Sequence, residues 1–234
     1  MQTVIFVPAR KNSTGIKGKN LINLNGKPLI SYTLKMCKKF SKKYTVFIST
    51  DSKKIKNYSQ KFGYRDEYLR PKKLSTSKSN VVDSIIHGIE WLKQKKKIKV
   101  KDIILLQPTS PLRKYSDIIK AIKIYKSKKL KSLTSVTKVR DNSLSHIRLK
   151  KKKQKWNYLY KDKKIKLINR QDYPKDHYMF NGSFYFSDYN YLKKKRSFAI
   201  ENETYLYEID RFSGLDIDYK SDLILAELLI RKQK

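Results

Sequence analysis

The chain has 234 residues, of which 56 are Lys or Arg and 20 are Asp or Glu, so its formal net charge is +36. Its hydrophobic residues (39%) and aromatic residues (12%) suffice for a sizeable core, which excludes a disordered chain because highly charged disordered chains contain few aromatics. The apolar runs are too short to cross a bilayer, no secretion signal is recognisable, and the single Cys37 excludes an intramolecular disulfide and a cysteine-based zinc site. We therefore expect a soluble cytoplasmic protein.

The first half of the chain alternates short apolar runs with amphipathic stretches. Residues 3–8 form an apolar, β-branched run that predicts a buried strand. The strands expected after it are 44–49, 102–106 and 132–137, and the expected helices are 29–40, 53–62, 81–92 and 116–128. Pro28 is expected to open the first helix and Ser52 to cap the second. Strands that alternate with helices imply right-handed crossovers and therefore an α/β fold with a mostly parallel sheet.

The pattern changes after about residue 140. Residues 148–180 are rich in lysine and aromatic residues without a helical period, which predicts short strands and loops in an inserted arm. The elements expected after the arm are a strand that begins at Asn181-Gly182, a strand at 206–209 and a helix at 222–232 capped by Ser221. No internal repeat or flexible linker is present, so we predict one principal domain over residues 1–234.

Three polar loops, 8–20, 49–52 and 107–113, follow predicted strands, and parallel sheets bind ligands at the carboxyl ends of their strands. The first loop combines glycines with hydroxyls and several cations. Glycines let main-chain N–H groups approach a polyphosphate, while cations such as Arg10 and Lys19 neutralise its charge. The loop lacks the Walker A pattern, and an ordinary solvated turn is the alternative interpretation.

Asp216 and Asp218 lie two residues apart in a stretch that reads Gly-Leu-Asp-Ile-Asp. On an extended segment, residues at this spacing point to the same side, and Leu215 and Ile217 would face the core. Paired carboxylates suit Mg²⁺, which binds one or two carboxylates together with phosphate oxygens. The alternative interpretation is an edge strand with solvated aspartates. A phosphate loop together with a metal pair favours nucleotide chemistry.

In this order, the motifs resemble those of the acylneuraminate cytidylyltransferases, or CMP-sialic acid synthetases. The resemblance covers nearly the whole chain. It rests on residues 8–20, 25–30, 49–51, 69–71, 107–113, 170–172, 181–182 and 215–218. It implies a Rossmann-like nucleotidyltransferase fold with a mostly parallel central sheet and a small dimerisation arm, inserted at about 140–180, in a homodimer.

The implied reaction transfers CMP from CTP to the anomeric 2-hydroxyl of a nine-carbon 2-keto acid sugar, releases pyrophosphate, and yields an activated sugar for surface glycans. The cofactor would be Mg²⁺, with Mn²⁺ as an alternative. The residues implied to bind nucleotide are Arg10, Ser13, Gly15, Lys19, Asn20 and Arg70. The implied catalytic residues are Arg10, Lys19, Asp216 and Asp218, with the two aspartates as metal ligands. The implied sugar-binding residues are Gln107, Arg170, Asn181 and Tyr185. His87 matches no motif and is predicted to pack within its helix.

The chain departs from the pattern of sialate-using members at two places near the sugar. Residues 143–146 replace a Lys, and residues 178–180 replace an Arg that often precedes the Asn-Gly pair. These departures favour a bacterial analogue, such as legionaminic or pseudaminic acid, as the acceptor. CMP-Kdo synthetase or another sugar nucleotidyltransferase is the alternative, although Gly15 and Lys19-Asn20 favour the nonulosonate branch.

The net charge of +36 leaves a basic nucleic-acid-binding protein as an alternative of a different class. However, Lys supplies 46 of the 56 basic residues and Arg only 10, whereas base recognition favours Arg. The chain is also rich in Ile (24) and poor in Ala (4), as AT-rich codon usage would produce, and its lysines are scattered over its whole length. We therefore predict a solvated basic surface, with neither nucleic acid nor membrane as a partner.

Overall fold

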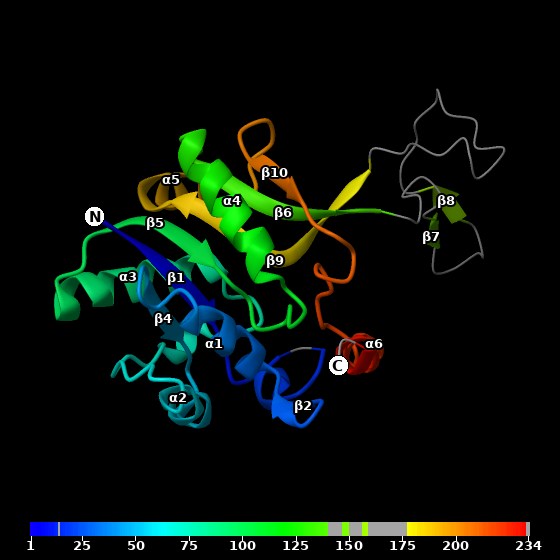
Figure 1. Ribbon diagram of the computed structural model, residues 1–234, viewed down its shortest axis with the longest axis horizontal. Coiled ribbons are helices and arrows are strands. Elements are labelled where there is room, and N and C mark those ends of the chain that lie inside the picture. The colour runs from blue at the N-terminus through cyan, green and yellow to red at the C-terminus, as the bar shows by residue number, and fades with distance from the viewer. Residues whose placement is uncertain (14, 140–146, 150–155, 159–176, 233–234) are drawn as a thin grey trace.

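The computed structural model describes residues 1–13, 15–139, 147–149, 156–158 and 177–232 (Figure 1). Its centre is a six-stranded sheet with the strand order β10-β6-β9-β5-β1-β4. The strands are β1 (Gln2–Pro8), β4 (Thr45–Ser49), β5 (Val100–Leu105), β6 (Ser132–Lys138), β9 (Tyr178–Asp188) and β10 (Tyr205–Glu208). β1 is parallel to β4 and β5, and β10 is parallel to β6, whereas β9 is antiparallel to both of its neighbours. The predicted α/β fold with a mostly parallel sheet is therefore confirmed.

Helices surround the sheet, and two short strand pairs lie outside it. The helices are α1 (Ile30–Lys38), α2 (Lys53–Gln60), α3 (Val81–Lys96), α4 (Tyr115–Ser127), α5 (Tyr189–Lys195) and α6 (Lys220–Lys232), with short 3-10 helices η1 (Lys19–Leu21) and η2 (Lys72–Leu74). The antiparallel pairs are β2 (Asn23–Leu24) with β3 (Lys27–Pro28), and β7 (Ile147–Leu149) with β8 (Trp156–Tyr158). Among the described residues, none of the helices is both long enough and apolar enough to span a membrane.

Alternate residues of the central strands enter two separate hydrophobic clusters, because successive side chains of a strand point to opposite faces. Ile5 and Val7 of β1 join a cluster with residues of α1 and α4. Val4 and Phe6 join a second cluster with residues of α3 and α5. A third, smaller cluster contains Ile16, Leu24, Leu29, Ile217 and Ala226. This third cluster packs the first polar loop against the residues that precede α6, and so brings distant parts of the chain together.

Two predicted helix starts are wrong. Pro28 does not open α1, because Asn25 and Gly26 both have positive φ (47° and 78°) and form a hairpin turn that pairs Pro28 with Asn23. Ser221 does not cap α6, since it lies inside the helix. Instead, the carboxylate of Asp222 accepts hydrogen bonds from the backbone N–H groups of Asp218 (2.9 Å) and Tyr219 (2.7 Å). The cap of α2 by Ser52 is confirmed, with a bond of 3.4 Å from the N–H of Ile55.

Strand β9 is longer than the strand predicted in this part of the chain. β9 begins at Tyr178 rather than at Asn181, and Gly182 lies inside it with a φ of 73°. The pairing of β9 with β6 shifts register there, so Asn-Gly marks an irregularity within a strand rather than a strand start. Helix α5 follows directly and has no counterpart among the predicted elements. It is short, and its buried Tyr189 and Leu192 belong to the second hydrophobic cluster.

The predicted dimerisation arm at about 140–180 lies largely outside the described residues. Within it, β7 and β8 pair as antiparallel strands, in agreement with the expected short strands. The arm's role in a dimer stays a prediction.

Candidate functional site

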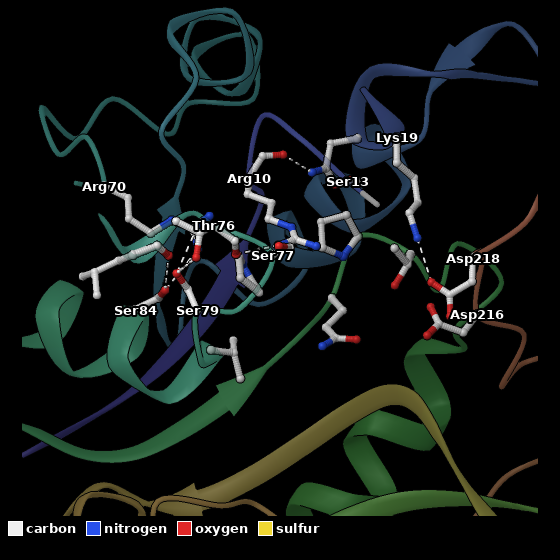
Figure 2. Close-up of a pocket in the computed structure, with 17 residues that line it drawn as sticks. Arg10, Ser13, Lys19, Arg70, Thr76, Ser77, Ser79, Ser84, Asp216 and Asp218 are labelled. Atoms are coloured by element: carbon white, nitrogen blue, oxygen red, sulfur yellow. Dashed lines mark hydrogen bonds and ion pairs between the residues drawn. The ribbon is translucent and has the colours of Figure 1, made fainter. Parts of the chain in front are cut away.

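A pocket of about 310 Å³ opens at the carboxyl ends of β1 and β5 (Figure 2). Two of the three polar loops line it, 8–20 and 107–113, as expected for a parallel sheet. The third loop, 49–52, holds a lining residue from behind, because its backbone carbonyls accept hydrogen bonds from Arg70. The polar residues that line the pocket are Arg10, Ser13, Lys19, Asn20, Arg70, Thr76, Ser77, Ser79, Ser84, Gln107, Thr109, Asp216 and Asp218.

Arg10 occupies the middle of the pocket. In Figure 2 it lies between an end with Arg70 and several hydroxyls and an end with Lys19 and the two aspartates. Its guanidinium donates a hydrogen bond to the Thr76 carbonyl (2.8 Å), and its own carbonyl accepts one from the Asn20 side chain (2.8 Å). The next residue is held by Asp51, whose carboxylate accepts from the Lys11 N–H (2.7 Å). These bonds fold the first loop back over the pocket.

Lys19 joins the first loop to the aspartate segment. Its side chain is buried, and Nζ donates to the Ile217 carbonyl (2.6 Å) and to Asp218 Oδ1 (2.8 Å). Gly15 allows this approach, because a Cβ at Gly15 would lie 2.3 Å from the Asp218 carbonyl oxygen. Gly15 does not itself line the pocket, so what the structure shows for it is close packing, and contact with nucleotide stays a prediction.

Asp216 and Asp218 both line the pocket, and Ile217 between them is fully buried, as predicted. They lie in a segment that is neither helix nor strand, and not in an edge strand. Burial raises the pKa of Asp216, while its hydrogen bond with Thr109 and the nearby cations Lys19 and Arg113 lower it. Its buried Oδ1 has no hydrogen-bond partner among the described residues. Asp218 is more exposed and forms the ion pair with Lys19.

A divalent cation fits this pair. The buried Oδ1 of Asp216 is a carboxylate oxygen without a partner at the pocket wall, which is the kind of ligand that Mg²⁺ prefers. The described residues contain no group of three or more acidic, His or Cys side chains that could hold a metal alone. The two aspartates would therefore supply part of a coordination shell that phosphate oxygens and water complete.

Arg70 forms the opposite end of the pocket. It is 5% exposed, and its guanidinium donates to Ser84 Oγ (3.1 Å) and to the Ser49 carbonyl (3.1 Å). Burial lowers the pKa of Arg70, and the nearby carboxylate of Asp51 raises it. The hydroxyl-rich residues 75–79 lie beside it, and they were not predicted as site residues. Their composition of Ser and Thr is typical of loops in general, so only the fold identifies them.

Of the predicted sugar-binding residues, Gln107 lines the pocket, whereas Tyr185 and Asn181 do not. A Cβ at Gly182 would lie 3.2 Å from Gln107 Oε1 and 3.0 Å from Asp216 Oδ2, so these three residues meet. Tyr185 is partly buried and close enough to Asp216 for that carboxylate to raise its pKa further, burial being the larger cause. Arg170 lies outside the described residues.

Asn181 has a structural role that the sequence did not reveal. Its buried side chain accepts from Ser135 Oγ (2.6 Å) and donates to Thr137 Oγ1 (2.7 Å), both on β6, where the register of the two strands shifts. It is absent from the pocket lining, so its contact with a sugar stays a prediction. His87 packs as expected, with its Nδ1 3.0 Å from the Tyr68 hydroxyl.

Comparison with known proteins supports the resemblance of the motifs. Residues 4–233 match the family model described as Cytidylyltransferase. The chain is 30% identical over 232 residues to an N-acylneuraminate cytidylyltransferase of Escherichia coli, a match that covers 98% of this chain and 52% of that protein. It is 30% identical over 234 residues to a CMP-N,N'-diacetyllegionaminic acid synthase of Legionella pneumophila, with 98% and 97% covered. A pseudaminic acid cytidylyltransferase of Campylobacter jejuni is 25% identical over 231 residues, with 99% and 97% covered.

The chain thus spans about half the length of the Escherichia coli relative and nearly all of the other two. Among solved structures, a CMP:2-keto-3-deoxy-manno-octonic acid synthetase complexed with CTP shares the fold, with a TM-score of 0.68 at 15% identity and all of both chains covered. A 4-diphosphocytidyl-2C-methyl-D-erythritol synthase from Anaerococcus prevotii has a TM-score of 0.61 at 14% identity, with 98% of each chain covered. The family model and the relatives agree with the motifs, and the chain belongs to the cytidylyltransferase family.

Proposed function

We propose that this protein transfers CMP from CTP to the anomeric 2-hydroxyl of a nine-carbon 2-keto acid sugar and releases pyrophosphate. The observation that carries the proposal is that Arg10, Lys19 and Arg70 line the same pocket as Asp216 and Asp218. Three cations suit a triphosphate, and two aspartates suit a divalent cation that accompanies it. Membership of the cytidylyltransferase family supports CTP as the nucleotide.

The acceptor we propose is sialic acid or a bacterial analogue such as legionaminic or pseudaminic acid, activated for surface glycan synthesis. Relatives named for each of these acids match nearly all of this chain. The exposed Met179 and Phe180 on β9 stand in the region where sialate-using members often carry an Arg, which favours one of the analogues.

The reaction requires the acceptor's 2-hydroxyl oxygen to attack the α-phosphorus of CTP. A new P–O bond forms, the bond from the α-phosphorus to the bridging oxygen of the β-phosphate breaks, and the hydroxyl proton is released. Such transfers depend mainly on positioning and on stabilising the charge of the phosphoryl oxygens. Arg10 and Lys19 stand in the pocket to stabilise that charge, and Arg70 with its hydroxyl neighbours would hold the rest of the nucleotide.

Asp216 and Asp218 would hold Mg²⁺, or Mn²⁺ in its place, because the unpartnered Oδ1 of Asp216 fits a cation. When bound, the ion would offset phosphate charge and favour the departure of pyrophosphate. Lys19 already donates to Asp218, so its ammonium stands where the loop, the aspartates and the phosphates would meet.

We further propose that the protein works in the cytoplasm, where CTP is available, and that it forms a homodimer. The exposed apolar residues Met179 (56%) and Phe180 (54%) at the start of β9 support a protein interface there. Light scattering on the purified protein measures its mass, and a monomer of 27.8 kDa at micromolar concentration would contradict the dimer.

The test of the function is pyrophosphate release with each of four nucleoside triphosphates and with sialic, legionaminic, pseudaminic and Kdo acids. We expect release only with CTP, Mg²⁺ and a nine-carbon acid. Asp218→Ala should abolish release with the fold intact, whereas Asp66→Ala, which removes a carboxylate paired with Lys96 outside the pocket, should not. A preference for Kdo, or no product with any acid, would contradict the proposal.

A further inference from the structure

Arg113 carries a buried charge that no described carboxylate contacts directly. Burial lowers the pKa of its guanidinium, although Asp216 is near enough to raise that pKa in part. It follows β5 and precedes α4, and only 4% of it is exposed. No carboxylate among the described residues lies within ion-pair distance of its guanidinium, and its Nε has no hydrogen-bond partner. Burying a charge in this way costs free energy that an apolar residue of similar size would not cost. Core packing alone therefore does not account for an arginine at this position.

The guanidinium of Arg113 instead holds the backbone where the chain leaves β5. Its Nη2 donates to the Gln107 carbonyl (2.6 Å), and its Nη1 donates to the Thr33 hydroxyl of α1 (3.3 Å). The Thr33 hydroxyl reaches the same carbonyl (3.5 Å). The planar fork of an arginine makes two such bonds at once, which a lysine ammonium cannot reproduce with the same geometry.

The residue that Arg113 holds lies at the aspartate end of the pocket. The Gln107 side chain meets Asp216 beside Gly182, as described above. Two residues farther along the same loop, the Thr109 carbonyl accepts the N–H of Ile217 (2.9 Å). A displacement of Gln107 would therefore move both the glutamine and the support of the aspartate segment.

We infer that Arg113 is a positioning residue for the acceptor sugar: it fixes Gln107 at the aspartate end of the pocket and places a positive charge beneath that end, which attracts an acidic acceptor. This inference rests on the proposed function, because it assumes an anionic acceptor next to Gln107. Arg113 is not itself among the pocket-lining residues, so it acts through Gln107 and through its charge.

The test compares Arg113→Met and Arg113→Lys with the wild type, with kcat and KM measured separately for CTP and for the acceptor that the wild type uses. We expect Arg113→Met to lower kcat/KM for the acceptor by roughly 100-fold, as a small misplacement of a substrate does, and to leave KM for CTP within about twofold. Arg113→Lys keeps the charge but loses the fork, so we expect it to recover part of the acceptor's kcat/KM. If Arg113→Met fails to fold, the kcat/KM of Arg113→Lys for the acceptor tests the inference in its place.

The matched control is Cys37→Ala, which truncates a fully buried side chain of α1 in the core near Arg113 without touching Gln107. It should lower the melting temperature yet leave the ratio of the two KM values unchanged. If the Arg113 variants change CTP and acceptor kinetics in equal proportion, or behave as Cys37→Ala does, the inference is overturned while the proposed function stands. A wild type that releases no pyrophosphate with any acid sugar would overturn the proposed function, and this inference with it.

Discussion

Asp216 and Asp218 stand two residues apart, yet the structure places their carboxylates in different environments. Asp216 is half-buried, its Oδ1 is buried without a hydrogen-bond partner among the described residues, and burial raises the pKa of its carboxyl. The side chain of Asp218 is 64% exposed and is paired with Lys19. The two acids are therefore not equivalent. Asp216 has a carboxylate oxygen available to a cation, whereas Asp218 links its segment to the first loop through Lys19.

Asp216→Asn should separate activity from stability. The amide keeps the size of the side chain but removes the charge, so we expect pyrophosphate release to fall by roughly 100- to 1,000-fold, as when one electrostatic contact to a transition state is lost. Because the pKa of Asp216 is raised, its ionised form is disfavoured in the fold, so we expect the melting temperature to stay unchanged or to rise when the charge is removed. Calorimetry and the pyrophosphate assay measure the two effects. Full activity in the variant, or a large loss of stability, would contradict this picture.

At the scale of elements, the turn at residues 210–214 holds Asp216 in its position at the pocket. The Asp210 carboxylate accepts from the backbone N–H groups of Phe212 and Ser213 (3.0 Å each) and from Lys114 Nζ (2.7 Å) at the start of α4. Gly214 then passes close to β6, since a Cβ there would lie 2.5 Å from Thr137 Oγ1. The turn thus depends on an ion pair and on a residue without a side chain.

The turn predicts an acid-dependent stability. Burial raises the pKa of Asp210, but hydrogen bonds from Lys114 and Ser213 outweigh it and hold the pKa to about 2. An unfolded Asp has a pKa of about 3.9, so this carboxylate stabilises the fold fully above about pH 4 and loses its effect as the pH falls toward about 2. Asp210→Asn should therefore melt below the wild type at neutral pH. The difference should vanish near pH 2 in calorimetric scans, and a constant difference at every pH would refute the assignment.

Gly15→Ala tests the packing of the first loop against the aspartate segment. The new methyl group would lie 2.3 Å from the Asp218 carbonyl oxygen, a backbone atom, so one of the two segments must move. We expect a destabilisation of about 1–3 kcal/mol, as for other overpacked sites, together with a loss of kcat/KM for CTP. The control is Gly63→Asn, at a left-handed position with open space, which should retain activity. Unchanged kinetics in Gly15→Ala would mean that the two segments are not coupled.

For the whole molecule, the net charge of +36 is a property of the surface rather than of the site. Among the residues that the structure describes, the buried basic side chains are those of Lys19, Arg70 and Arg113. Two of them line the pocket, and the third lies behind it. The other lysines and arginines within residues 1–139 and 177–232 are partly or fully exposed to solvent. These three buried charges therefore belong to the site, whereas the exposed lysines and arginines produce a general positive field around the molecule.

That field should affect association rather than chemistry. Raising the ionic strength from about 0.01 to about 0.15 M shortens the Debye length from about 30 to about 8 Å, so we expect kcat/KM for CTP to fall while kcat stays constant. Replacing the exposed Lys93 and Lys95 of α3 by Glu should lower kcat/KM slightly and leave kcat unchanged. Kinetics that do not change with salt would contradict an effect of the field on association, and tight binding to duplex DNA at physiological salt would contradict a surface without a nucleic-acid partner.

The sequence by itself determined the local features of this protein. Strand β1, the helices α1 to α4 and the cap of α2 follow from hydrophobic periodicity and from residues adjacent in the chain, and their predicted bounds differ from the structure by only a few residues. The first loop and the paired aspartates could also be predicted from the sequence, because the residue types and spacing of a short motif indicate which ligand it can bind. Local pattern failed at β9, where an Asn-Gly pair that is typical of turns lies inside a strand.

Only the tertiary structure decided which of these features meet. Lys19 reaches Asp218 across 199 residues of sequence, and that contact depends on the strand order of the sheet and on the small cluster around Ile16 and Ile217. The hydroxyls beside Arg70, the internal bonds of Asn181 and the buried charge of Arg113 likewise come from packing between distant segments. Periodicity reports which face of an element is buried, but it says nothing about the side chains that the opposite element brings to that face.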